Sequence, residues 1–365
     1  MPETVRFVAP DRNAIQTKFF PTLKSRVDAY FAEKKISSHA NAEMVFKTFL
    51  FTGGMVLFYC LILFGGFGPW AMLGFSMLLG ACIAFIGFNV CHDAIHGGYS
   101  ANGKVNHILG LLFNVVGANA YVWSITHNVI HHTYTNIPGH DEDIDVAPGM
   151  IRLSPEEEWK PVMRYQHLYA FLLYGLASLS WVLRKDYKKF FQEYIGPRKN
   201  EHKPTDYFTL FFFKAVYYTI FIVIPLVVLP ITWWQFIIGF VAMHLVEGMI
   251  LGVIFQLAHV VESTEFPYPN TENKIEENWA VHEMRTTANF ARKNRVINFL
   301  VGGLNFQVEH HLFPQVCHVH YPKIAPIVEA TAREFNVPYN DNPTFLGAIQ
   351  SHYRMLKQFG NPGKA

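Results

Sequence analysis

Charged residues are scarce in this sequence. Asp, Glu, Lys and Arg make up 16% of its 365 residues, whereas soluble domains contain about 25%. Hydrophobic residues account for 51%, and the formal net charge is only +2. This composition is typical of a membrane protein, and the near-neutral charge gives no indication of a nucleic-acid partner.

Cysteine and several familiar motifs are also missing or rare. The four cysteines are scattered and include no CxxC pair, so the sequence predicts no disulfide framework. The polar opening MPETVRFVAPDRN predicts no cleavable signal peptide. The zinc-protease motif HExxH is absent, because His282 and Glu283 are followed by Met, Arg and Thr.

Long hydrophobic runs, in contrast, are present and occur in pairs. The first pair covers residues 48–64 and 70–90, and the second covers 215–229 and 233–257. Short turns, GGFGP in the first pair, separate the two runs of each pair. Because about 20 apolar residues span a bilayer, the sequence predicts an all-α integral membrane fold. It consists of two transmembrane hairpins, with four spans in total, and a cytosolic helical cap.

The basic residues indicate the orientation. Of the 30 Lys and Arg residues, 28 fall outside the hairpins, and Lys47 and Lys214 lie at the inner ends of the first and third spans. The positive-inside rule makes this basic side cytoplasmic, so we expect both termini and the cap in the cytosol. The predicted parts are a cytosolic N-terminal arm (1–43), a membrane domain with its cap (44–330) and a C-terminal cytosolic tail (331–365).

One apolar segment leaves the topology open. Residues 168–183 are only 16 residues long; if they crossed the membrane, the histidine clusters of the two halves would face opposite sides. Basic residues follow the segment, as is common for helices that lie in the membrane interface. We therefore expect it to lie in the interface, and we interpret residues 105–122 similarly. The basic residues are Arg184, Lys185, Lys188 and Lys189.

Histidine is the residue in excess, with 18 copies, and it recurs in three short clusters: NVCHDAIHGG, HNVIHH and QVEHH. Within each cluster, potential ligands recur three or four residues apart and therefore share one face of a helix. The first cluster directly continues the second span, and a lone histidine follows the fourth span. The candidate metal ligands are His92, His96, His127, His131, His132, His259, His310, His311 and, less certainly as a donor, Gln307.

The number of these ligands indicates how many metals they hold. Two iron ions with five or six ligands each require about eight to ten donors, and imidazole suits iron. The eight histidines, with Gln307 as a weak ninth donor or a group that contacts a neighbouring imidazole, match two metals better than one.

The clusters HDAIH, HNVIHH and QVEHH resemble the three histidine boxes of membrane fatty acid desaturases. The resemblance covers about residues 44 to 320, and the segments HHTYTN, DEDID and WAVHEMRTTANF extend it. A glutamine at the first position of the third box is similar to front-end desaturases, which insert a double bond between an existing one and the carboxyl end. Such enzymes often carry a fused cytochrome b5 domain with an HPGG motif, which this sequence lacks.

The resemblance implies an O2-dependent desaturase that introduces a cis double bond into a long-chain, linoleoyl-like acyl-CoA or acyl-lipid. It implies two iron ions (Fe2+/Fe3+) as cofactors and O2 as co-substrate. A separate ferredoxin or cytochrome b5 type protein would supply the electrons. We expect an integral protein of the lipid bilayer, in a bacterial inner membrane, with its active site cytosolic.

Two other functions remain open at this point. A membrane di-iron hydroxylase or oxygenase of a lipid would use the same ligands, and its product would gain one oxygen atom instead of losing two hydrogens. A metal transporter would also be rich in histidine, but transporters carry their ligands near the bilayer midplane. Here the clusters lie just outside the predicted spans.

Further polar residues are candidates near the site. His244 and Glu247 lie in the middle of the fourth span, where ionisable residues are functional candidates. They either line an acyl channel or form a buried hydrogen bond between helices. The acidic loop HDEDID (140–145) is either solvated or orients an imidazole of the second cluster, with Asp143 as the candidate.

Basic residues before the third cluster are candidates for binding the substrate headgroup. Arg285, Arg292 and Lys293 could meet an anionic coenzyme A or lipid headgroup, or could simply lie at the cytosolic leaflet, where basic residues are common. We expect structural or surface roles for the remaining histidines that we considered: His107, His167, His282, His318 and His320.

Overall fold

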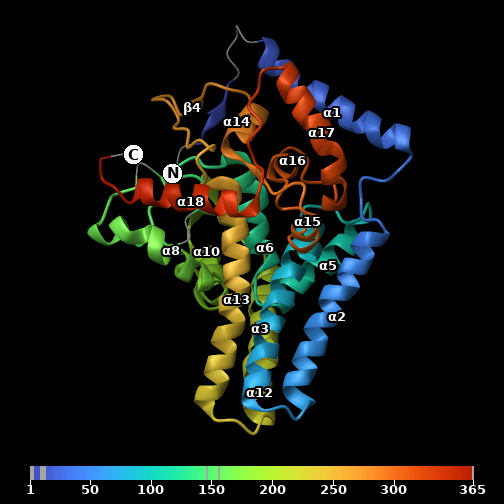
Figure 1. Ribbon diagram of the computed structural model, residues 1–365, viewed down its shortest axis with the longest axis vertical. Coiled ribbons are helices and arrows are strands. Elements are labelled where there is room, and N and C mark those ends of the chain that lie inside the picture. The colour runs from blue at the N-terminus through green and yellow to red at the C-terminus, as the bar shows by residue number, and fades with distance from the viewer. Residues whose placement is uncertain (1–3, 9–13, 145–146, 155–156, 364–365) are drawn as a thin grey trace.

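The computed structural model describes residues 4–8, 14–144, 147–154 and 157–363. Its four candidate spans are Ala42–Phe64, Pro69–Ile95, Pro204–Val228 and Trp233–His259. Figure 1 shows these spans as an elongated bundle at one end of the molecule, with the other helices gathered as a cap at the other end. The predicted helical membrane fold with two hairpins is confirmed.

The first hairpin consists of α2 (Ala42–Phe64) and α3 (Pro69–Ile86). Helix α2 begins before the apolar run because the Asn41 side chain accepts a hydrogen bond from the Met44 backbone N–H and caps the helix. Helix α3 begins with Pro69, which is well suited to a first helical position. It continues without interruption through a π-helical turn, η1 (Gly87–Cys91), into α4 (His92–Ile95).

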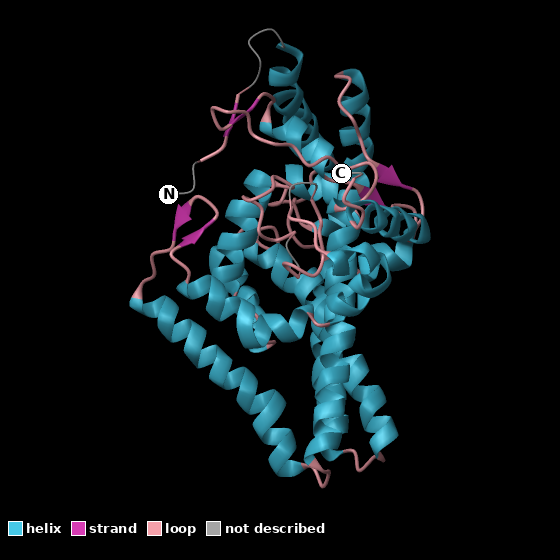
Figure 2. Cartoon of the chain, turned by 90° about the vertical axis from the view of Figure 1, so that its left-hand side faces the viewer, coloured by secondary structure: helices cyan, strands magenta, loops and turns pink. Residues whose placement is uncertain are grey.

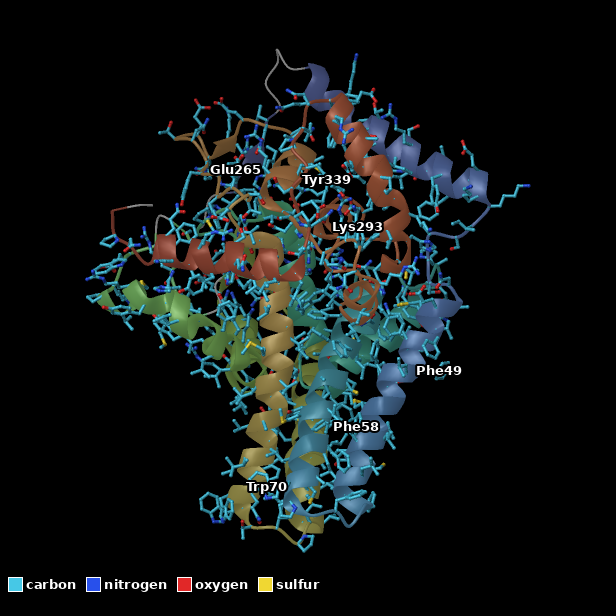
Figure 3. All side chains as sticks on the ribbon, in the orientation of Figure 1. Phe49, Phe58, Trp70, Glu265, Lys293 and Tyr339 are labelled. Carbon is cyan, nitrogen blue, oxygen red and sulfur yellow. The ribbon has the colours of Figure 1, made fainter. Side chains whose placement is uncertain are left out.

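The second hairpin consists of a span in three parts and a long straight helix. The first span comprises α11 (Pro204–Tyr218), the π-helical turn η5 (Thr219–Val223) and α12 (Ile224–Val228); the second is α13 (Trp233–His259). Helix α13 packs closely against α3, since a Cβ atom at Gly80 of α3 would collide with the Met243 carbonyl. Figure 3 shows Phe49, Phe58 and Trp70 on the hairpins, and Trp70 is 85% exposed, as expected of a residue that faces lipid.

The two segments that we placed in the interface do not form straight spans. Residues 166–191 form α8 (Gln166–Gly175), α9 (Ala177–Ser180), the π-helical η4 (Trp181–Lys185) and α10 (Asp186–Phe191), none of which is long enough to cross a membrane. The other segment bends by 111° between α5 (Gly103–Val115) and the helical stretch Ala120–Tyr134. Figure 1 shows α5, α6, α8 and α10 beside the cap end of the spans.

The cap is built mainly of short helices. Helix α1 packs against α17, and α18 packs against α8 and α13. Helix α17 runs across residue 330, where we placed the boundary between the membrane domain and the C-terminal tail. The cap helices are α1 (Ala14–Lys34), α6 (Ala120–Trp123), η2 (Ser124–His131), α7 (His132–Tyr134), η3 (Pro161–Tyr165), α14 (Trp279–Thr286), α15 (Arg295–Leu300), α16 (Gln307–Leu312), η6 (His318–His320), α17 (Tyr321–Glu334) and α18 (Phe345–Phe359).

Strands are short and lie in the cap half of the molecule (Figure 2). The described residues form three two-stranded pairs. β1 and β4 are parallel, β2 and β3 are antiparallel, and β5 and β6 are parallel. Their bounds are β1 (Arg6–Phe7), β2 (Tyr194–Ile195), β3 (Arg198–Lys199), β4 (Lys274–Ile275), β5 (Asn289–Phe290) and β6 (Asp341–Asn342).

Candidate metal centre

The predicted ligands come from four separate elements that meet where the spans join the cap. The first cluster lies on α4 and the loop that follows it, directly after the π-helical turn η1; the second lies on the π-helical η2 and on α7. The third lies on α16, and His259 is the last residue of α13. π-Helical turns are rare and often occur at functional sites. In two of these elements, such a turn lies within or directly before the histidine cluster.

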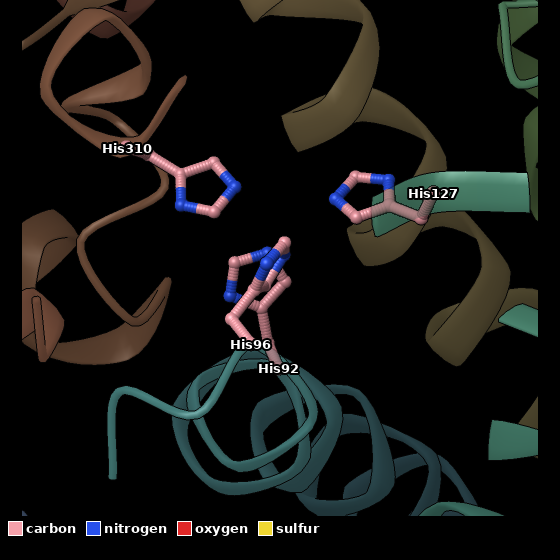
Figure 4. Close-up of side chains that lie close together, drawn as sticks. All are labelled: His92, His96, His127 and His310. Atoms are coloured by element: carbon pink, nitrogen blue, oxygen red, sulfur yellow. The ribbon is translucent and has the colours of Figure 1, made fainter. Parts of the chain in front are cut away.

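The ring nitrogens of these histidines form two compact groups. In each group, one ring nitrogen from every histidine lies within 4.8 Å of the others. All of the side chains are buried, and Figure 4 shows the four imidazoles of the first group directed toward a common point. The first group is His92, His96, His127 and His310, and the second is His131, His259 and His311.

His132 lies between the two groups. Its ring centroid is 4.7 Å from that of His310 in the first group and 4.3 Å from that of His311 in the second. Both of its ring nitrogens are buried and have no hydrogen-bond partner among the described residues. The structure therefore brings all eight predicted histidines together, although the chain separates the outermost ones by more than 200 residues.

The two nitrogens of several imidazoles have different surroundings. Nδ1 of His127 lies 3.2 Å from Asp143, Nδ1 of His131 lies 2.9 Å from Asp141, and Nδ1 of His311 lies 2.7 Å from Glu283. In the same three rings, Nε2 is buried without a partner among the described residues. A carboxylate that holds Nδ1–H leaves the Nε2 lone pair free for a metal.

These carboxylates were only partly foreseen. Asp143 contacts the second cluster as predicted, but Asp141 from the same loop makes the shorter contact. Glu283 was missed as a partner of His311, because we considered it only as part of an incomplete protease motif. Tyr321, whose hydroxyl lies 3.2 Å from Nδ1 of His310, was also missed. The one sequence feature that could have indicated this role is that Glu283 is an acidic residue on the helix before the third cluster.

The electrostatics of the cluster suit a bound cation. Burial, together with neighbouring imidazoles, holds the pKa of His310 and His311 well below the ordinary value. Burial also raises the pKa of Glu283 well above its ordinary value. Although burial opposes it, contact with His131 keeps the pKa of Asp141 low. Neutral imidazoles are the form that binds metals, so the unpartnered nitrogens and their acidic partners fit a metal centre.

An apolar cavity borders the first histidine group. Its volume is about 160 Å³, and His92, His127 and Gln307 line it together with mostly hydrophobic and aromatic side chains. We call it the apolar cavity. Gln307 is buried, and its Oε1 atom has no hydrogen-bond partner among the described residues. Gln307 therefore lines the same cavity as His92 and His127.

His244 and Glu247, in the middle of the fourth span, differ in what surrounds their side chains. His244 is enclosed by polar partners, with Nε2 at 2.7 Å from the Tyr217 hydroxyl and Nδ1 at 2.9 Å from the Ser178 hydroxyl and 3.2 Å from Glu247. Glu247 lines a small cavity of about 20 Å³, which shares Gly87 and three further residues with the apolar cavity. His244 thus forms the hydrogen bonds between helices that we considered, and Glu247 lines the small cavity next to the apolar cavity.

The predicted headgroup cations are largely neutralised. Arg285 contacts Glu265 at 3.3 Å and Glu277 at 3.4 Å. Arg292 lies 2.7 Å from Asp341 and 3.2 Å from Glu329. Lys293 and Arg292 line a cavity that shares no residue with the apolar cavity. Among these three, only Lys293 has no ion pair with a described residue.

The histidines that we assigned to structural or surface roles lie outside the two groups. His107 is exposed, His282 is buried against the Thr135 carbonyl, and His320 is buried against the His39 carbonyl. His318 is buried with Asp93 and Cys317, but Lys47 Nζ lies 2.8 Å from its Nε2. The adjacent ammonium group makes this last cluster a poor cation site.

Comparisons with known proteins agree with this geometry. A family model described as fatty acid desaturase matches residues 67–343. The chain is 38% identical to an sn-1 linoleoyl-lipid 6-desaturase of Arthrospira platensis, covering 94% of this chain and 93% of the relative. It is also 38% identical to a protein of the same name from Synechocystis sp., at 94% and 95% coverage. An acyl-lipid (8-3)-desaturase of Physcomitrium patens is 36% identical, at 94% and 72% coverage.

Proposed function

The chain belongs to the fatty acid desaturase family, and on this premise we propose that it inserts a cis double bond into an unsaturated acyl chain of a membrane lipid. The observation that carries this proposal is that His92 and His127 of the first buried histidine group line an apolar cavity, with the second histidine group next to the first. An unactivated methylene group can react only if it is held next to the oxidising centre and away from water, and an apolar cavity lined by metal ligands meets both requirements.

The ligands that we propose for the two iron ions follow the two groups. His92, His96, His127 and His310 would hold one ion. His131, His259 and His311 would hold the other, with His132 between the two groups and Gln307 as a weaker further donor. Bound iron would supply the reduction of O2 and the abstraction of hydrogen, a chemistry that side chains alone do not offer.

The protein's own residues orient the ligands and position the substrate. Asp143, Asp141 and Glu283 hold three imidazoles through Nδ1 and thereby direct Nε2 toward the metals. Aromatic side chains of the apolar cavity, such as Phe113 and Trp123, keep water away from the reacting carbons. In the overall reaction, two hydrogens of the acyl chain, two electrons and two protons convert O2 into two water molecules. A ferredoxin or cytochrome b5 type protein supplies the electrons.

The substrate that we propose is an acyl-lipid carrying a linoleoyl-like chain. Two supports are the printed names of the cyanobacterial relatives and the glutamine of the third histidine cluster, which is similar to that of front-end desaturases. We place the metal centre and both termini on the cytosolic side of a bacterial inner membrane. The support for that orientation is the distribution of Lys and Arg outside the hairpins.

Expression in a host fed candidate fatty acids, followed by gas chromatography–mass spectrometry with double-bond location, tests the proposal. A product two mass units lighter than its precursor would be a desaturated chain, and its fragments would give the position. A product sixteen units heavier would show a hydroxylase instead. The negative control is His131→Ala, which we expect to insert into the membrane and to form no product. Product formation by this variant would remove His131 from the ligand set.

A further inference from the structure

A second cavity, which is larger and more polar than the apolar cavity, lies between the loop after the second histidine cluster and the helical stretch 180–192. Its volume is about 820 Å³. Four cations from η4 and α10 line it together with the carboxylates Asp141, Glu142 and Glu157, and we call it the basic vestibule. These cations are Arg184, Lys185, Lys188 and Lys189.

Among the described residues, two of these four cations have an ion pair. Lys189 forms an ion pair with Glu142, and Lys185 Nζ lies 3.5 Å from Asp143 Oδ1. Arg184 and Lys188 are exposed and form no ion pair with any described residue. They lie four residues apart on one continuous helical stretch, where like charges are neighbours and repel each other. An anion bound between them would relieve that repulsion.

The basic vestibule adjoins the apolar cavity. Ser180 and Lys185 line both spaces. Asp141 lines the vestibule and Asp143 lines the apolar cavity, so the loop that orients His131 and His127 forms part of the wall between them. A cationic space that continues into an apolar one matches an amphiphile with an anionic head and a hydrocarbon tail.

We infer that the basic vestibule binds the phosphate-bearing headgroup of the acyl substrate, with Arg184 and Lys188 as its principal contacts. This inference rests on the proposed function, because it assigns the headgroup end of the same substrate. A phosphate group offers several acceptor oxygens to both side chains, and an arginine guanidinium can bind two of them at once. The phosphate belongs to a phospholipid headgroup or to coenzyme A.

The arrangement also sets the direction of the acyl chain. With the headgroup in the vestibule, the ester or thioester lies near Ser180 and Lys185, and the chain runs past His92 and His127 toward Glu247. The position of the double bond is then counted from the carboxyl end, because the distance from the vestibule to the metal centre is constant. This direction is the one that front-end desaturation requires.

The test is equilibrium binding to the full-length protein in dodecyl maltoside micelles, which contain no phosphate, followed by intrinsic tryptophan fluorescence. Trp181, one of the seven tryptophans, lines the apolar cavity. The probes are linoleoyl-CoA, dilinoleoyl phosphatidylglycerol and uncharged dilinoleoyl monogalactosyl diacylglycerol. For the double variant Arg184→Gln/Lys188→Gln, we expect about tenfold weaker binding of a phosphate-bearing probe and unchanged binding of the galactolipid. The difference should shrink at high salt.

Two further variants complete the design. Arg184→Lys/Lys188→Arg keeps both charges and should bind the phosphate-bearing probe like the wild type. Lys104→Gln/Lys323→Gln removes two exposed cations away from the vestibule, and neither lysine has an ion pair with a described residue. It should leave the binding of every probe unchanged. Lys185 stays unaltered in all variants, because it contacts the carboxylate that holds His127.

The outcomes separate the sources and the two proposals. Weaker binding of linoleoyl-CoA alone identifies coenzyme A as the source of the phosphate, and weaker binding of phosphatidylglycerol alone identifies a lipid headgroup. The headgroup site would be overturned if the Arg184→Gln/Lys188→Gln variant lost affinity for the galactolipid to the same extent as for the phosphate-bearing probes. It would also be overturned if the control variant lost the same affinity, or if neither variant bound any probe more weakly than the wild type. Absence of any desaturated product from the wild type, with the charge-dependent binding intact, would overturn the proposed function and leave the site in place.

Discussion

Glu283 Oε2 lies 2.7 Å from Nδ1 of His311, and both side chains are completely buried. The Thr135 hydroxyl, just after the second histidine cluster, donates a hydrogen bond to the same carboxylate oxygen at 2.9 Å. One acidic residue thus connects the second cluster, α14 and the third cluster. It is the kind of contact that holds an imidazole in one orientation and increases its basicity toward a metal.

Replacement of Glu283 by glutamine should weaken the metal centre without unfolding the protein. Glutamine has the same shape but cannot ionise when a cation binds, so we expect iron affinity to fall about 10- to 100-fold. The iron content of purified protein, measured after dialysis against a series of chelator concentrations, would detect this change. Glu276→Gln is the matched control, since Glu276 is exposed on the segment before α14. Equal iron retention in the two variants would exclude the proposed role of Glu283.

Gln307 can be tested by substituting one donor for another. Histidine should keep two irons per chain and part of the activity, because its imidazole is also a metal donor. Leucine fills a similar space without a donor and should lower both quantities. Iron analysis and product formation, measured on the same preparations, distinguish the variants. If both behave like the wild type, Gln307 lies outside the metal centre.

Substitutions of Gly87 test the path that we propose for the acyl chain. It lines both the apolar cavity and the small cavity beyond it, and an added Cβ would have its nearest neighbours at an ordinary 3.9 Å. Gly87→Ala should therefore fold and react normally, whereas Gly87→Leu should block the passage. We expect turnover of an 18-carbon chain to fall about tenfold or more and turnover of a 14-carbon chain to fall less.

The control for this prediction is a glycine on the same helix. A Cβ at Gly74 of α3 would have no neighbour within 4 Å, so Gly74→Leu adds the same side chain away from the cavity. It should leave chain-length preference unchanged. If Gly87→Leu slows both chain lengths equally while retaining its iron, the chain does not pass Gly87.

The buried position of His352 predicts that the folding stability of the protein depends on pH. Its Nδ1–H donates to the Val260 carbonyl at 2.7 Å, and its Nε2 accepts from the Tyr174 hydroxyl at 2.9 Å. Burial lowers the pKa of His352 to about 4. The unfolded chain therefore binds the proton more readily, so this residue's stabilisation is complete above about pH 6.5 and is lost as the pH falls toward 4.

The difference between wild type and His352→Gln would reveal this contribution. Glutamine can make both hydrogen bonds but does not titrate, so the acid-induced loss of unfolding free energy should be smaller by up to about 3 kcal/mol. Thermal unfolding of iron-loaded protein between pH 6.5 and 4.5 measures it. His107→Gln, at an exposed position, should match the wild type. Parallel curves of stability against pH for all three proteins would contradict this role of His352.

Local features of the sequence were sufficient for the membrane fold and for choosing the histidines that the structure brings together. The length of the apolar runs determined the four spans, since a bilayer requires about 20 apolar residues and the hairpin turns are short. The spacing of three or four residues placed histidines on one face of a helix, because an α-helix repeats every 3.6 residues. These are properties of consecutive residues and need no knowledge of distant contacts.

Tertiary structure decided how those histidines are grouped and what surrounds them. Each histidine group combines clusters from different elements, so His127 and His131, four residues apart, fall into different groups. The partners Glu283 and Asp141, the ion pairs of Arg292, and the position of Arg184 beside a cavity all depend on segments that are distant in sequence or approach through a loop. Hydrogen bonds and ion pairs act only over a few ångströms, and which groups come that close is determined by the packing of the whole chain.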